Sequence, residues 1–292
     1  MPLDQMNVDD WEMDEHGRPL PPVEKEMSFI DHLEELRWHV VRSLVAILIG
    51  GIGLFIFRDW YFERILFGPM QADFISYEYI CKWTGGSLCL APPESITVQA
   101  IGMGEQFITS VKMAFVGGFV IAFPYVFYEF WSFIRPGLYA KEQQATRWVI
   151  LISSLLFFIG ISFGFLVVAP FGTYFLTNFT VGGAENIPTM DSVIGYMTMF
   201  TLPAALIFEL PIVVHFLASF GLVTAEAMRK YRKHSLIGIL ILASVMTPPD
   251  VVTQVLIAVP LYSLYEISIF VAKRAQRKYE ADLDAPLDST AR

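Results

Sequence analysis

Charge is scarce in this 292-residue chain. Asp, Glu, Lys and Arg make up 17% of it, against about 25% in ordinary soluble domains, which is too little to cover the surface of a soluble protein of this size. The chain also lacks a basic excess: its formal net charge of −9 argues against a nucleic-acid-binding surface. Apolar and aromatic residues reach 54%, a composition that excludes a disordered chain and most soluble enzymes.

Residues suited to hydrolytic or metal chemistry are few as well. The chain has five His and contains neither a His-Glu-x-x-His motif nor a phosphate-binding loop. Residues 160–164 read Gly-Ile-Ser-Phe-Gly, the letters of a nucleophile elbow, but that motif needs a strand-to-helix turn and here it lies in an uncharged apolar run. We interpret Gly160 and Gly164 as a place where a neighbouring helix packs closely, and we expect no catalytic residue, metal or cofactor.

Long apolar runs are what the chain does contain, and they predict six membrane spans. The expected spans are residues 38–57, 113–134, 148–170, a stretch within 192–225, 235–246, and 251 towards 271. The fifth reaches only roughly 18 Å of a hydrocarbon layer ~30 Å thick. Thr247-Pro248-Pro249-Asp250 should end it, so we expect a short hairpin of two short helices, with Glu266 near the membrane surface.

Basic residues predict the orientation. The segments before span one and after spans two, four and six hold 16 of the 20 Lys and Arg, which places both termini in the cytoplasm under the positive-inside rule. We therefore expect an all-α polytopic protein with three parts. These are a disordered acidic tail (1–26) without the apolar core of a signal peptide, a six-span domain (27–272) and a cytoplasmic C-terminal tail (273–292).

Only two cysteines are present, Cys81 and Cys89, both in the long loop after the first span. That loop is expected on the non-cytoplasmic side, where disulfides persist, and Gly85 and Gly86 between them let the chain turn back. We predict a disulfide, with two free thiols as the alternative. No His lies in this loop, which argues against a metal site.

Two carboxylates are expected at the cytoplasmic membrane surface. Residues 28–37 predict the start of an amphipathic helix that brings Glu35 there; a solvated face on which Glu35 balances Arg37 or His39 is the alternative. After the second span, Pro136-Gly137 turns the chain and brings Glu142 to the same surface.

A third carboxylate, Glu209, lies near the middle of the fourth span, where an acid needs a cavity or a polar partner. A purely structural bond to a neighbouring helix is the alternative.

Taken in order, three segments resemble the TatC family, the multispanning core subunit of the twin-arginine protein translocase. They are His32-Leu33-Glu34-Glu35-Leu36-Arg37, the stretch from Phe133 to Glu142 with Pro136 and Tyr139, and Thr247-Pro248-Pro249-Asp250 followed by Gln254. The likeness covers roughly residues 27–278. It implies a cupped-hand arrangement of six helices, with helices five and six short, in the bacterial inner membrane.

The resemblance also implies a function without bond chemistry. Family members recognise signal peptides with paired arginines on folded proteins, and they assemble with TatA-type and TatB-type single-span subunits in a multimeric complex driven by the protonmotive force. Glu35 and Glu142 should contact the two arginines, since guanidinium groups need fixed carboxylates. Arg37 and Phe133 should help to shape the site.

Four further positions take roles from the same resemblance. Pro69 matches a functionally sensitive proline, and Asp250 and Gln254 match positions tied to transport at the outer face. Glu209 would face the concave surface and pair with a polar group of a partner helix or of the inserted signal peptide.

Two other classes of protein remain as alternatives. A proton-coupled secondary transporter or channel would use Glu209 as its coupling carboxylate, but we see no internal repeat of the kind such proteins often show. An intramembrane hydrolase lacks a dyad, because His215 lies about 240° around the helix from Glu209.

Overall fold

The computed structural model describes residues 29–86, 89–90, 92, 97–134, 146–183, 186–246 and 251–283. The acidic tail, Glu142 and the predicted turn at residues 247–250 lie outside the described residues. The described ranges form helices and loops, with one isolated parallel bridge between Gln99 and Thr189 and no β-strand among them. The expected all-α class is confirmed.

The longer helices alternate with short helical turns along the chain. In order, the elements are α1 (Phe29–Ile56), α2 (Arg58–Tyr61), η3 (Phe62–Leu66), η4 (Gly68–Met70), α3 (Ile75–Trp83), α4 (Glu105–Ile134), α6 (Thr146–Phe163), η6 (Gly164–Val168), α7 (Ala169–Asn178), α8 (Met190–Phe208), α9 (Leu210–Ser219), α10 (Ala225–Lys230), α11 (Arg232–Met246) and α12 (Val251–Leu283). Within the described ranges, five stretches are long and apolar enough to cross a membrane: Leu33–Ile56, Glu105–Ile134, Trp148–Asn178, Met190–Ser219 and Thr253–Arg277.

The predicted fifth span corresponds to α11, which has 15 residues and begins at Arg232 rather than Ser235. At 1.5 Å per residue it reaches roughly 22 Å, short of the hydrocarbon thickness. The expectation that the next helix is also short is wrong, because α12 has 33 residues. Glu266 does not interrupt α12, since Arg232 Nη2 and the Tyr262 hydroxyl donate to its carboxylate at 2.6 and 3.1 Å.

The predicted fourth span is divided into α8 and α9. The two helices meet at Glu209, which ends α8 and precedes α9 with φ −75° and ψ −9°. Pro211 has no N–H to donate to the preceding turn, which explains why the helix breaks here. Pro203, within α8, does not end the helix. The break therefore places a carboxylate where the helical hydrogen bonds are interrupted.

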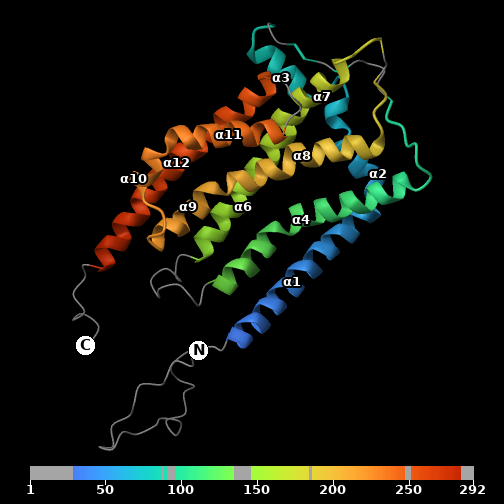
Figure 1. Ribbon diagram of the computed structural model, residues 1–292. Helices are drawn as coiled ribbons and strands as arrows, with labels where there is room; N and C mark the ends of the chain where they lie inside the picture. The colour runs from blue at the N-terminus through green and yellow to red at the C-terminus, as the bar shows by residue number, and fades with distance from the viewer. Residues whose placement is uncertain are drawn as a thin grey trace, which may run out of the picture.

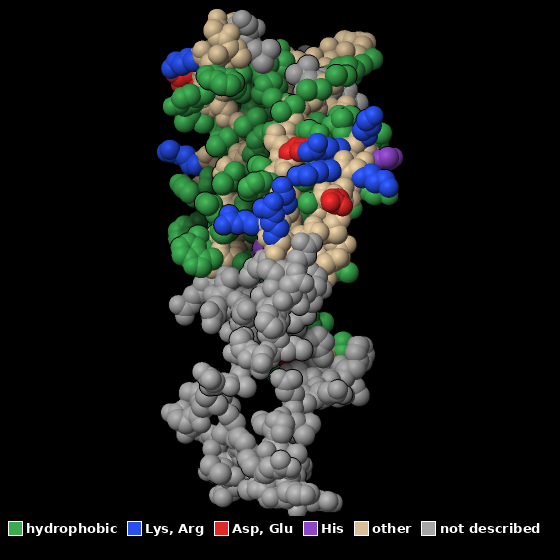
Figure 2. Space-filling view, turned by 90° about the vertical axis from the view of Figure 1, so that its left-hand side faces the viewer, with side chains coloured by type: hydrophobic (Ala, Val, Ile, Leu, Met, Phe, Trp, Pro, Cys, Tyr) green, Lys and Arg blue, Asp and Glu red, His purple; other side chains and the backbone are tan. Residues whose placement is uncertain are grey.

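The helices lie side by side with α1 and α4 at one edge of the molecule and α11 and α12 at the other, and α6, α8 and α9 between them (Figure 1). The start of α1 and the end of α12 lie at the same end, whereas the short helices α3 and α7 lie at the opposite end. Figure 2 shows Lys and Arg side chains gathered over the face formed by α10, α11 and α12. The basic residues of α10, of the start of α11 and of the last turns of α12 are Arg229, Lys230, Arg232, Lys233, Lys273, Arg274 and Arg277.

Glycines let neighbouring helices approach closely. A Cβ atom at Gly118 of α4 would lie 2.5 Å from the carbonyl oxygen of Ile47 in α1. Cβ atoms at Gly160 and Gly164 would lie 2.6 and 2.5 Å from backbone atoms of α8. The predicted packing role of Gly160 and Gly164 is therefore confirmed, and Gly118 plays the same part between α1 and α4.

The contact at Gly118 predicts a clear effect of one added methyl group. Gly118→Ala should lower the free energy of unfolding by about 1–3 kcal/mol, because backbone atoms of α1 cannot move away as a side chain would. Gly195→Ala, in α8 with nothing within 4 Å of the added Cβ, should instead stabilise the helix slightly. Thermal unfolding of the purified protein in detergent measures both. Equal melting temperatures of the two variants would contradict this account of the contact.

Candidate functional site

The first turns of α1 place two adjacent acids in different surroundings. Glu34 is exposed, and its Oε1 lies 3.6 Å from Arg37 Nη2, with both side chains more than half exposed. Glu35 is half-buried, and its Oε2 is shielded from solvent and accepts no hydrogen bond from the described residues. Arg37 therefore lies beside Glu34, and Glu35 is the carboxylate with a shielded, unbonded oxygen among the described residues.

The last turns of α4 lie beside this part of α1. The Phe133 ring meets the His39 ring edge to face, with centroids 6.1 Å apart, and His39 Nδ1 donates a hydrogen bond to Glu129 Oε2 at 2.5 Å. Glu35 lies one turn before His39, on the same side of α1. The structure thus brings Phe133 and Glu35 to one side of α1, whereas the placement of Glu142 beside them stays a prediction.

His39 and Glu129 form a pair that the sequence did not predict. Glu129 is only 3% exposed, although it lies in an apolar helix of a chain with few charges. The acid within a predicted span was a visible signal, since such a residue needs a polar partner. Its partner was not predictable, because the sequence does not contain the register between α1 and α4.

Glu209 is enclosed between α6 and the break that separates α8 from α9. Its side chain is 7% exposed, and the Ser153 hydroxyl donates a hydrogen bond of 2.6 Å to Oε2. The other oxygen, Oε1, is buried and has no hydrogen-bond donor among the described residues. Glu209 therefore has a partner within the chain, as the structural alternative expects, and is not displayed on an open surface.

The opposite end of the molecule holds Pro69 and the two cysteines. Pro69 is buried in η4, and the Tyr77 hydroxyl of α3 donates a 2.6 Å hydrogen bond to its carbonyl. Burial raises the pKa of Tyr77, so the hydroxyl keeps the proton that this bond requires. Cys81 and Cys89 form a disulfide with Cα atoms 4.4 Å apart, in agreement with the prediction. The disulfide closes the loop that follows α3, the helix on which Pro69 is anchored.

Gln254 lies between α11 and α12. Its Nε2 donates a 3.0 Å hydrogen bond to the carbonyl oxygen of Leu240 in α11, so this side chain ties the two helices of the hairpin. Asp250 lies outside the described residues. Roles of Gln254 and Asp250 in transport stay predictions.

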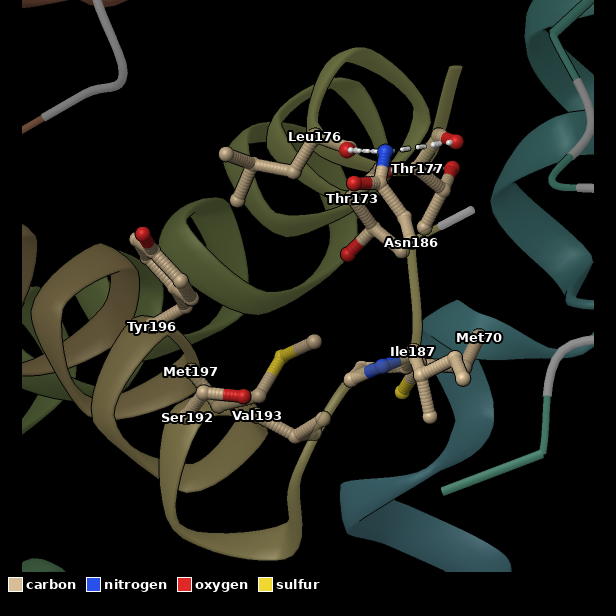
Figure 3. A pocket seen from close by; sticks show the side chains of 11 residues that line it. Met70, Thr173, Leu176, Thr177, Asn186, Ile187, Ser192, Val193, Tyr196 and Met197 are labelled. Atoms are coloured by element: carbon tan, nitrogen blue, oxygen red, sulfur yellow. Dashed lines mark hydrogen bonds between the residues drawn. The ribbon is translucent and has the colours of Figure 1, made fainter. Parts of the chain in front are cut away.

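A cavity of about 230 Å³ lies between α7, α8 and η4 (Figure 3). The amide of Asn186 donates to the carbonyl oxygens of Leu176 and Phe179 at 3.1 and 2.8 Å, and so caps the end of α7. No Asp, Glu, His, Lys or Arg is among the described residues that line this cavity. The polar groups here serve the helix end, and the functional candidates remain Glu35 and Glu209.

The fold and these polar groups define a helical membrane protein of several spans. Residues 31–260 match the family model of TatC, the Sec-independent protein translocase protein. The chain is similar to TatC of Desulforapulum autotrophicum, with 35% identity over 259 residues that cover 89% of each chain. It is also similar to TatC of Aquifex aeolicus, with 34% identity over 254 residues that cover 86% of this chain and 97% of that one.

Two solved structures are similar to this chain as well. A crystal structure of the twin arginine translocase receptor TatC in the detergent DDM matches with a TM-score of 0.66 and 32% identity, over 83% of this chain and 99% of that chain. A second crystal structure of the same receptor matches with a TM-score of 0.62 and 31% identity, over 84% and 100%. The chain belongs to the TatC family of Sec-independent protein translocase components.

The free oxygen of Glu209 predicts an order of effects on export. Glu209→Ala should reduce export at least tenfold, and Glu209→Gln less, because Gln keeps an oxygen for Ser153 and a polar group for a second partner. Ser153→Ala, which removes only the internal bond, should be the mildest change. The measurement is the export rate of a folded reporter with a twin-arginine signal, normalised to the membrane level of each variant. Equal export by the Ala and Gln variants would assign Glu209 a structural role only.

Proposed function

We propose that this chain is the receptor subunit of a twin-arginine translocase and binds signal peptides with paired arginines at the cytoplasmic face of the bacterial inner membrane. The observation that supports this most directly is the shielded Oε2 of Glu35, which accepts no hydrogen bond within the described part of the chain. A guanidinium group offers five donors in a planar fork and bonds a carboxylate held in a fixed position. Glu35 offers such an acceptor at the end of an apolar helix.

Three other residues complete the proposed site. Glu142 takes the second arginine, and Phe133, beside the His39 ring, supplies an apolar wall. Arg37, whose side chain is 65% exposed, places a positive charge at the rim, which limits where a second cation binds. Binding and release of a peptide need no covalent step, so the proposal includes no catalytic residue and no cofactor.

The proposed orientation has six spans, counting the short α11, and both termini in the cytoplasm. The start of α1 and the end of α12 lie at the same end of the molecule (Figure 1), which an even number of spans requires. The basic residues over α10, α11 and α12 (Figure 2) suit the cytoplasmic side under the positive-inside rule. The disulfide between Cys81 and Cys89 suits an oxidising compartment on the other side.

The proposed partners are single-span subunits of the TatA and TatB types, in a multimeric complex that uses the protonmotive force. A groove of about 440 Å³ between the end of α1, α4, α6 and α8 supports a concave, cupped arrangement open to a partner helix. Tyr61 lines it, and burial raises the pKa of Tyr61 to about 12, so its hydroxyl remains a neutral donor. In this proposal the free Oε1 of Glu209 receives a polar group of a partner.

The outer end has a separate proposed role. Pro69, Asp250 and Gln254 act there in transport, after the signal peptide has bound at the inner end. The bond from Gln254 to Leu240 and the bond from Tyr77 to Pro69 support a rigid outer rim. Membership of the TatC family favours this function over a proton-coupled transporter that uses Glu209.

Charge reversal tests the proposed site. The double variant Glu35→Lys with Glu142→Lys should weaken binding of a twin-arginine signal peptide about 100-fold or more, because each lost charge-assisted hydrogen bond contributes about 1.5–3 kcal/mol. Crosslinking of a photoreactive peptide in membrane vesicles measures it, with membrane insertion checked in parallel.

Glu34→Lys is the matched control, since Glu34 is the adjacent acid and is exposed. It should change peptide binding no more than about threefold, as expected for a surface charge. Retained crosslinking in the double variant would refute the assignment of Glu35 and Glu142.

A further inference from the structure

A buried polar pair joins the two helices that carry the proposed peptide site. Glu129 of α4 is 3% exposed, although the residues on either side of it, Tyr128 and Phe130, are exposed apolar or aromatic side chains. A carboxylate in such a place is costly unless a partner bonds it. Its partner comes from α1, one of the three helices that pack against α4.

The partner is His39. Its Nδ1 lies 2.5 Å from Glu129 Oε2, and the two side chains are 13% and 4% exposed. The Tyr125 hydroxyl, one turn earlier on α4, also bonds Glu129. Arg42 Nη1 lies 3.9 Å from the same oxygen but its side chain is 58% exposed, so His39 provides the enclosed contact between α1 and α4.

The pair lies one helical turn from Glu35 on α1 and one turn from Phe133 on α4. Glu35 and His39 are separated by four positions on α1, and Glu129 and Phe133 by four positions on α4, so each couple shares a helix face. The ring of His39 also contacts the ring of Phe133 directly. A shift between the helices at this pair would move Glu35 relative to Phe133.

Further along the two helices, backbone contact replaces polar contact. Gly118 of α4 lies so close to α1 that an added Cβ would be 2.5 Å from the Ile47 carbonyl oxygen and 2.6 Å from the Gly51 nitrogen. This contact fixes α1 on α4 nearer their other end. The polar pair is the second fixed point, and it is the one next to the site.

We propose that His39 and Glu129 are positioning residues for signal-peptide recognition. Their bond joins the first turns of α1 to the last turns of α4 and holds Glu35 and Phe133 at a constant separation. This inference rests on the proposed function. It assigns no contact between Glu129 and the peptide, because the carboxylate is enclosed and already bonded by His39 and Tyr125.

A double-mutant cycle with a restored pair tests the inference. The dissociation constant of a twin-arginine signal peptide is measured by titration of purified protein in detergent. His39→Ala and Glu129→Ala should each raise it about tenfold, and the double variant should be no weaker than either single variant, since both remove one interaction. The exchanged pair, His39→Glu with Glu129→His, should bind within about threefold of the original protein. Lys112→Ala, which removes the exposed 2.7 Å bond between α4 and Asp191, is the control and should leave the constant unchanged.

A distance measurement separates positioning from direct contact without any peptide. Spin labels on the exposed positions Val40 of α1 and Phe130 of α4, introduced by Val40→Cys and Phe130→Cys, report the separation of the two helices. The distance distribution should broaden in His39→Ala and narrow again in the exchanged pair. Weaker peptide binding without broadening, or no rescue by the exchanged pair, would overturn the positioning role and point to contact of Glu129 with the peptide.

One more variant distinguishes failure of this inference from failure of the proposed site. If Glu35→Gln weakens peptide binding and the His39 and Glu129 variants do not, the positioning role is overturned and the site stands. If none of these variants changes binding, the proposed site itself is overturned.

Discussion

A carboxylate inside an apolar helix must be bonded by another group, and this requirement links the helices of the molecule. Three acids of the described helices meet it with a side chain from a different helix. The pairs are Glu129 with His39, Glu209 with Ser153, and Glu266 with Arg232. They join α4 to α1, the break between α8 and α9 to α6, and α12 to α11. Because an unpaired buried charge is strongly destabilising, the buried pairs at Glu129 and Glu209 each select one arrangement of their helices. The pair of Arg232 and Glu266 is partly exposed and contributes less.

The same requirement separates residues that bond one helix to another from residues that keep an unbonded oxygen for a ligand. His39 and Glu129 bond one another, whereas Glu35 Oε2 and Glu209 Oε1 are shielded and accept no hydrogen bond from residues that the structure describes. A shielded acceptor without a donor favours binding of a group that brings one. A guanidinium at Glu35 and a polar group of a partner at Glu209 are the donors that the proposed function supplies. The bonds between helices thus form without ligands, and the two unbonded carboxylate oxygens lie where ligands are proposed to bind.

Much of the fold was predictable from the sequence because lipid imposes a strong pattern. The apolar runs predicted the all-α class, and Gly160 and Gly164 predicted a close contact between helices. The length of α12 was not predicted, because the sequence shows the charge of Glu266 but not the Arg232 and Tyr262 side chains that satisfy it. The break at Glu209 was marked by Pro211, yet its partner Ser153 depends on the register between separate helices. Of the candidate site, the sequence singled out Glu35 and Phe133, but the pair behind them depends on how α1 packs against α4.

The bonded pairs between helices are proposed to hold a site that recognises paired arginines, and an export assay tests this function most directly. A host without its own TatC receives this chain together with TatA-type and TatB-type subunits from the same organism, and export of a folded reporter is measured. The account predicts that export is restored for a reporter whose signal peptide carries two arginines and not for the same reporter with two lysines, because lysine cannot offer the planar fork of donors. Restored export with both signals, or no export although the chain inserts into the membrane, would contradict it.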